Sequence, residues 1–149
     1  MKSAYLLTCF TLLLASACDS IPADPGGTLD RVRCDHVFRL GLIATDQHIG
    51  AGREQAFLRR VAAETGAAPK VERGSLERLL TRLEADEIDL VVGEVAPDSP
   101  WAKRVSLLPP LGEQVSARGH VQLVPIARNG ENAWIALLHR HAKAVAALP

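Results

Sequence analysis

The sequence predicts an α/β fold, a single lobe with a mostly parallel central sheet flanked by helices. Two observations support this fold. Within Ser75–Gly93 four leucines recur at i, i+3, i+4 and i+7, the spacing of one face of a helix. They are Leu76, Leu79, Leu80 and Leu83. Directly afterwards, Leu90–Val92 is an apolar run without alternation, which is typical of a strand covered on both faces.

The segments before this helix and strand show the same alternation of strands and helices. Val37–Ala44 reads as the first strand, and Arg53–Thr65 as a helix that Gly66 ends as a C-cap. Ala68–Glu72 reads as a short second strand. Right-handed crossovers would place the three strands in one parallel sheet.

The first 17 residues read as a signal peptide. Lys2 is followed by the apolar run Leu6–Leu14, which is too short to span a membrane. The sequence LASAC then resembles a bacterial lipoprotein signal, which implies lipidation of Cys18 and a periplasmic, membrane-anchored protein. By resemblance to lipoprotein sorting in enteric bacteria, Asp19 favours the inner membrane. The alternative is an ordinary signal peptide cut near Ala17, which leaves Cys18 as a thiol.

The rest of the chain divides into a tether and one domain. Residues 18–36 are rich in proline and glycine and are expected to form a flexible tether, so the folded lobe would span residues 37–149. Without the leader, sixteen basic residues face seventeen acidic ones. Near neutrality the chain has no electrostatic reason to bind nucleic acid.

Signatures of catalysis and of cofactor binding are absent from the sequence. It contains no G-x-S-x-G, H-E-x-x-H, phosphate loop or C-x-x-C, so we expect neither an enzyme nor a cofactor. His139 and His141 are too poorly spaced on a helix for a metal site, and Cys34 reads as a bystander. A run of carboxylates before the third strand is expected to be a solvated edge. Its members are Glu84, Asp86, Glu87 and Asp89.

The segment Leu83–Gly93, LEADEIDLVVG, resembles the motif L-x-x-G-x-I-D-L-V-V-G in the first lobe of family 3 periplasmic solute-binding proteins of ABC transporters. Asp86 stands where glycine is usual. The R-x-G of the first strand, the Thr-Gly end of the following helix and the segment from Gln122 onward are also similar. The resemblance implies a lobe of the type II periplasmic-binding-protein fold, which binds a small polar solute such as an amino acid and works with an ABC permease.

The sequence departs from this family in length. A second lobe would be inserted between Leu111 and His120, where the sequence offers only an eight-residue loop, Gly112–Gly119. The second lobe is therefore expected to be absent, unless a partner chain supplies it. Two other interpretations stay open: a relict lobe that acts as a protein-interaction module or homo-oligomer, and a fragment that folds poorly. A docking face should be flat and apolar around Val95, Pro97 and Trp101.

The resemblance also implies where the solute would bind. Ligand contacts would come from the loop after the first strand and the segment after the third. The candidates are Thr45, Asp46, Glu94, Trp101 and Arg104. Glu94 would repel a carboxylate, and Trp101 occupies the position of the family's carboxylate-binding arginine. Each of three candidates also has a structural interpretation: Asp46 in its own turn, Trp101 as a cover of the core, Arg104 in a salt bridge.

Overall fold

The computed structural model describes residues 24–45, 49–116 and 119–148. The expected signal peptide, the expected lipidation site Cys18, the expected sorting residue Asp19 and the candidate Asp46 lie outside these residues. Among the helices that are described, none is both long enough and apolar enough to cross a membrane.

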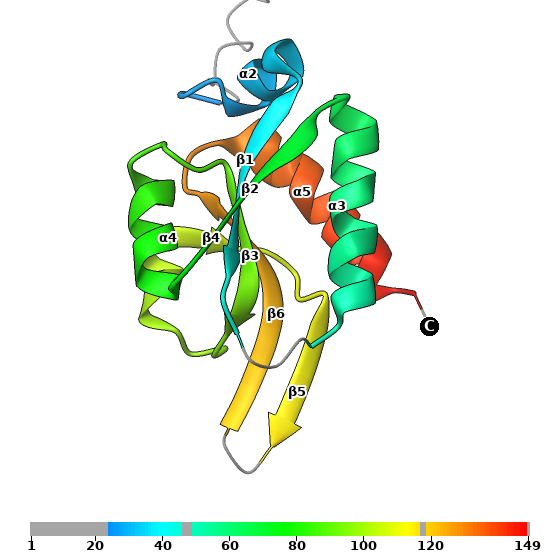
Figure 1. The fold of residues 1–149 in the computed structure, drawn as a ribbon. Coiled ribbons are helices and arrows are strands. Elements are labelled where there is room, and N and C mark those ends of the chain that lie inside the picture. The colour runs from blue at the N-terminus through cyan, green and yellow to red at the C-terminus, as the bar shows by residue number, and fades with distance from the viewer. Residues whose placement is uncertain (1–23, 46–48, 117–118, 149) are drawn as a thin grey trace, which may run out of the picture.

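A six-stranded sheet forms the centre of the molecule, in the order β2-β1-β3-β6-β4, with β5 pairing with β6 (Figure 1). Strands β1, β2 and β3 are parallel, as the sequence predicts, whereas β6 runs antiparallel to β3, β4 and β5. The sheet is therefore mixed. Its strands are β1 Val37–Ile43, β2 Ala68–Gly74, β3 Leu90–Val95, β4 Val105–Leu107, β5 Gly112–Ser116 and β6 Gly119–Arg128.

Helices cover both faces of the sheet. In Figure 1, α3 and α5 lie on one side and α4 on the other. The helices are α2 Thr28–Asp35, α3 Ala51–Thr65, α4 Leu76–Glu84 and α5 Asn132–Ala146, with a short 3-10 helix at Pro100–Lys103. Gly66 ends α3 with a positive φ of 68°, the left-handed conformation that glycine adopts most readily.

Each face of the sheet has its own hydrophobic core. Leu90 and Val92 point into the core under α3 and α5, and Val91 points into the core under α4. All three side chains are buried. The leucine stripe of α4 closes the second core with Leu79, Leu80 and Leu83. This arrangement confirms the prediction of an α/β lobe whose third strand is covered on both faces.

The structure corrects the expected tether. Residues 28–35 form helix α2, and its Leu29 and Val32 are buried in the core under α3 and α5. The helix is held by contacts with distant residues that local composition does not reveal. Glu131 accepts hydrogen bonds from the backbone N–H groups of Gly26 (2.8 Å) and Thr28 (3.0 Å).

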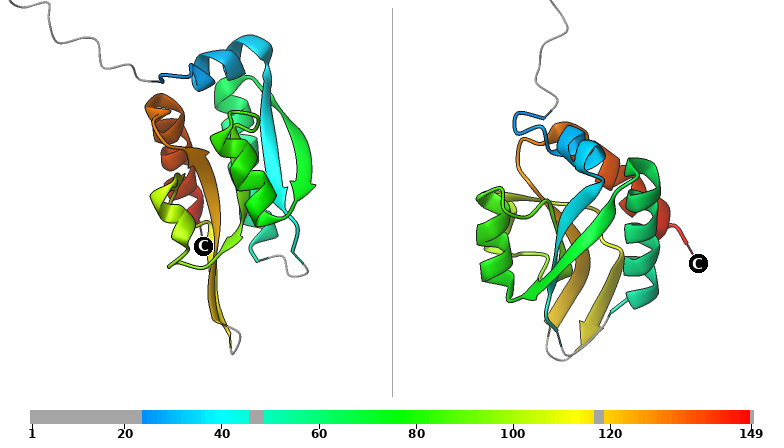
Figure 2. Two further views of the ribbon diagram at one scale, coloured as in Figure 1. Left: turned by 90° about the vertical axis from the view of Figure 1, so that its left-hand side faces the viewer. Right: turned by 45° about the horizontal axis from the view of Figure 1, so that its top comes forward.

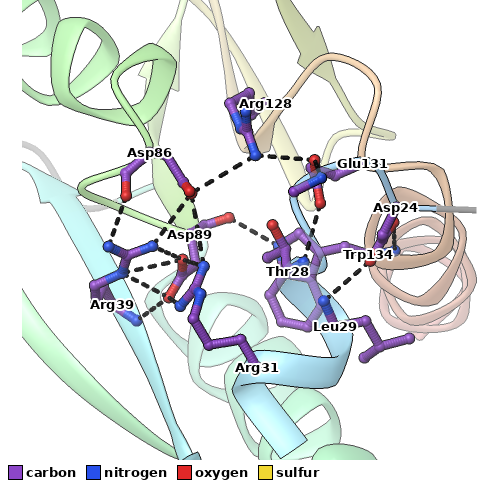
Figure 3. Close-up of polar contacts among 11 residues, drawn as sticks. Asp24, Thr28, Leu29, Arg31, Arg39, Asp86, Asp89, Arg128, Glu131 and Trp134 are labelled. Carbon is purple, nitrogen blue, oxygen red and sulfur yellow. Dashed lines mark hydrogen bonds and ion pairs between the residues drawn. The ribbon is translucent and has the colours of Figure 1, made fainter. Parts of the chain in front are cut away.

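Asp24 joins α2 to α5. Its Oδ2 accepts from the N–H of Leu29 at 3.0 Å, and its Oδ1 accepts from Ala133 (2.8 Å) and Trp134 (3.2 Å) (Figure 3). One carboxylate therefore satisfies first-turn N–H groups of two helices, which otherwise lack partners. The folded unit begins at least thirteen residues before residue 37, since residue 24 already belongs to it.

The expectation of a loop at residues 112–119 is also wrong. Gly112–Ser116 is strand β5, which forms a hairpin with β6. Figure 2 shows this hairpin projecting beyond the rest of the sheet. The hairpin stands at the place where a second lobe would be inserted.

Asp89 contradicts the expectation of a solvated acidic edge. Its side chain is fully buried and accepts from Arg39 Nη2 at 2.5 Å and Arg31 Nη2 at 2.7 Å (Figure 3). Burial alone would raise the pKa of Asp89, but the hydrogen bonds from Arg39 and Arg31 outweigh it and lower the pKa. Asp86 lies within 3.7 Å of three arginines at the edge of this cluster, among them Arg128.

Candidate functional site

The carboxyl ends of β1 and β3 lie beside each other, and ligands of open α/β sheets bind at this edge. A cavity of about 100 Å³ opens there. Its polar lining is Thr45, Glu54, Arg73 and Glu94. Its apolar lining includes Leu42, Ile43, Ile49 and Leu123. Two sequence candidates, Thr45 and Glu94, are thus brought together.

Glu94 is held in place by neighbours from the loop after β1. Its Oε1 accepts a hydrogen bond from the backbone N–H of Ile49 at 3.0 Å, and its Oε2 lies 3.4 Å from the hydroxyl of Thr45, which donates to it. A carboxylate has about four lone-pair sites, so Glu94 retains capacity for a further donor. Positively charged or hydrogen-bond-donating groups are the ligand chemistry that it can bind.

Gly93 lets β1 and β3 approach each other at the cavity wall. A Cβ built at Gly93 would lie 2.4 Å from Cβ of Ile43, far inside the contact distance of two carbon atoms. Both residues line the cavity. Glycine is therefore needed at this position for packing, next to the residue that presents the carboxylate.

Arg73 is a cavity residue that the sequence analysis missed, because the predicted second strand ended at Glu72. In the structure β2 continues to Gly74, and Arg73 lies in register with Leu42 of β1. Side chains alternate along a strand, so Arg73 lies on the same sheet face as Leu42, the face under α3. The signal that could have found it is the continuation of the strand pattern up to the glycine.

Arg104 and Trp101 lie elsewhere, on the α4 side of the sheet. The guanidinium of Arg104 bonds both carboxylate oxygens of Glu84, at 2.8 and 2.5 Å. It also lies 4.6 Å from the centroid of the Trp101 ring, within the range of a cation–π contact. Trp101 packs against the core under α4. The structural interpretations of both residues, core cover and salt bridge, match these contacts, and neither residue lines the cavity.

The site has no visible catalytic arrangement among the described residues. Neither histidine nor cysteine occurs in the described lining of the cavity, and the described part of the chain holds no cluster of three potential metal ligands. The cavity offers two carboxylates, of which that of Glu94 is held by hydrogen bonds, together with a hydroxyl, a guanidinium and apolar side chains. Such a set can bind and orient a polar molecule.

Comparison with known proteins shows likeness in structure alone. No family model matches the chain, and no curated protein matches it in sequence. The arginine-bound form of domain 1 from TmArgBP matches with a TM-score of 0.65 at 14% identity, over 77% of this chain and 98% of that one. An ancestral cationic amino acid solute-binding protein matches with a TM-score of 0.61 at 11% identity, over 78% of this chain and 93% of that one.

A third match is the VFT2 domain of Bordetella pertussis BvgS, with a TM-score of 0.59 at 9% identity, over 83% of this chain and 94% of that domain. Likeness at such low identity establishes the fold. The chain has the fold of a single lobe of a periplasmic-binding protein, as the resemblance of its motifs implied.

Proposed function

We propose that this chain is a non-catalytic solute-binding lobe, which binds a small polar solute such as an amino acid or a related compound at the carboxyl edge of β1 and β3. The observation that carries the proposal is the cavity in which Thr45 and Glu94 converge. The alternative of a docking surface lacks support from the same region. Val95 is buried, Trp101 is partly buried beneath the guanidinium of Arg104, and of the three residues expected on such a face Pro97 alone is exposed.

The charges of the cavity favour a solute with a positively charged group. Glu94 and Glu54 contribute two carboxylates to the lining, and Arg73 contributes one guanidinium. An ammonium or guanidinium group would complement Glu94, since hydrogen bonds between charged partners are stronger than neutral ones. An amino acid with a basic side chain would match this balance of charges.

A single lobe encloses little of such a solute. The cavity of about 100 Å³ is smaller than the roughly 300–1,000 Å³ of typical small-molecule sites. Part of the solute would therefore remain outside the lobe, available to an ABC permease or to a partner that supplies a second lobe. The arginine-bound form of domain 1 from TmArgBP supports the idea that one lobe of this fold can hold an amino acid.

The proposal includes export. Residues 1–17 would be removed as a signal peptide, and Cys18 would carry the lipid that anchors the lobe in the periplasm, with Asp19 favouring the inner membrane. The likeness of the lobe to the periplasmic domain of B. pertussis BvgS supports a periplasmic location. The segment between Cys18 and residue 24 would serve as the remaining tether.

Thermal unfolding of residues 19–149 against a panel of amino acids, amines, carboxylates and sugars tests the proposal. We expect one chemical class to raise the midpoint in a saturable way, because a ligand of the folded state stabilises by about 2.7 kcal/mol at 100 times Kd. Glu94→Gln should reduce the shift, whereas Glu77→Gln, an exposed position on α4, should leave it unchanged. Cooperative unfolding that no solute moves would refute solute binding.

A further inference from the structure

We propose that Arg73 anchors an anionic group of the solute, so that Arg73 and Glu94 bind opposite charges of one zwitterionic molecule. The inference rests on the proposed function and adds to it the orientation of the solute and the residue that takes the place of the family's carboxylate-binding arginine. It follows from three observations on the position, pairing and surroundings of Arg73.

The first observation is position. Arg73 pairs in register with Leu42, and Leu42 pairs with Val92, so the three residues form one row across the parallel strands. Glu94 lies two residues beyond Val92, on the same face of β3 because side chains alternate. Arg73 and Glu94 therefore share one sheet face, on strands that flank β1, and both line the same cavity.

The second observation is pairing. Arg73 is exposed, and among the described residues it has no hydrogen bond or ion pair with a carboxylate. The neighbouring arginines of this region differ, since Arg78 and Arg82 both bind Glu72. The guanidinium of Arg73 is thus available for a ligand, and its planar donor pair matches the geometry of a carboxylate.

The third observation is that the other candidate cation is engaged. Arg104 lies on the segment where the family's carboxylate-binding arginine would lie. It is bound to Glu84 through two hydrogen bonds and stacks on Trp101. Among the described residues that line the cavity, Arg73 is the sole cationic side chain. A solute carboxylate that enters this cavity beside Glu94 would be repelled unless it pairs with Arg73.

Isothermal titration with L-arginine and agmatine tests this inference. The two probes share a guanidinium that can face Glu94, but agmatine lacks the carboxylate. With Arg73→Gln we expect Kd for L-arginine to rise by about ten- to a hundredfold, the range of one charged hydrogen-bonded contact. Kd for agmatine should stay within about twofold. Arg60→Gln, an exposed arginine on α3, is the matched control and should change neither affinity.

Each result decides between the proposals. An Arg73→Gln variant that binds L-arginine as tightly as the unaltered chain, or that loses both probes equally, would overturn the role of Arg73 while leaving solute binding in place. Failure of the unaltered chain to bind L-arginine, with another solute bound in the panel, would overturn it as well. Failure of every solute in the panel would refute the proposed function itself. Unfolding midpoints of the variants equal to that of the unaltered chain would show that the substitutions leave folding intact.

Discussion

Asp89 binds Arg39 through both backbone and side chain: its Oδ2 accepts from the Arg39 backbone N–H at 2.7 Å, and its Oδ1 from Nη2 at 2.5 Å. Trp134 donates its indole N–H to the carbonyl of Asp89 at 2.8 Å. Asp89, the residue directly before β3, therefore links β1 to the core residue Trp134 of α5. These bonds lie at the amino ends of the parallel strands, at the opposite end of the sheet from the cavity.

Asp89→Asn should destabilise the fold by about 2–4 kcal/mol, because it removes the charge that compensates two arginines at a buried position. Urea unfolding followed by circular dichroism measures this loss. Asp98→Asn, an exposed aspartate, is the control and should fall within about 0.5 kcal/mol of the unaltered protein. A similar small effect for Asp89→Asn would show that the cluster contributes little net stability.

Stability should decrease in acid. Burial alone would raise the pKa of Asp89 and of Glu131, but hydrogen bonds from Arg39 and Arg31 to Asp89, and from Thr28 and Gly26 to Glu131, lower both. A carboxylate whose pKa is lower in the folded state contributes stability above its unfolded pKa, near 3.9 for Asp and 4.3 for Glu, and loses it as pH falls through the folded value.

Unfolding midpoints between pH 7 and pH 3 test this prediction. We expect a plateau above about pH 5 and a decrease below it, in the range set by the unfolded pKa values of the two residues. The acid decrease should be smaller in Asp89→Asn and in Glu131→Gln, since each variant removes one of the groups that titrate. If the midpoint of both variants decreased in acid as steeply as that of the unaltered protein, other carboxylates would be responsible for the acid sensitivity.

Gly93→Ala should destabilise the protein by about 1–3 kcal/mol, the usual cost of overpacking. The new Cβ would lie 2.4 Å from Cβ of Ile43, and the two residues belong to the paired strands β3 and β1. Gly52→Ala is the matched control, because a Cβ at Gly52 meets nothing within 4 Å. Alanine should be neutral or slightly stabilising there, in the first turn of α3. Equal unfolding midpoints for the two variants would contradict the tight packing.

Arg104→Gln should leave the affinity for any solute unchanged, although Arg104 lies on the segment that resembles the carboxylate-binding segment of solute-binding proteins. The reason is that Arg104 is paired with Glu84 and does not line the cavity. The side chain of Arg104 in its ion pair with Glu84 is exposed, so losing this ion pair should lower the free energy of unfolding by less than about 1 kcal/mol. Titration of the variant beside Arg73→Gln separates the two arginines. A loss of affinity that is specific to Arg104→Gln would mean that this segment rearranges on binding.

Local pattern was sufficient to predict the core of the fold. The leucine spacing of α4, the unbroken apolar run of β3 and the Gly66 cap of α3 are encoded within a few residues, and all three occur in the structure. Ser75 is the N-cap of α4, but its side chain makes no capping hydrogen bond. The helix is held mainly by burial of its leucines.

Features that depend on distant residues could not be predicted in this way. Helix α2 follows a proline- and glycine-rich stretch, and the N–H of its first residue, Thr28, donates to Glu131, more than a hundred positions away. In the sequence Asp89 cannot be distinguished from the other acidic residues of its run, because its partners Arg31 and Arg39 lie far from it along the chain. The cavity likewise combines four separate segments of the chain, and Arg73 lines it because β2 continues past Glu72 to Gly74.

Lipidation of Cys18 is a prediction from the sequence LASAC alone. Expression of the full chain in bacteria that are fed radioactive palmitate should label the protein, and Cys18→Ser should abolish the label, because the thiol of that residue would receive the lipid. Cys34→Ser is the matched control, since Cys34 is an exposed free cysteine in α2 and should not affect labelling. If the unaltered chain is cleaved near Ala17 without taking up label, the leader is an ordinary signal peptide and the lobe is released into the periplasm.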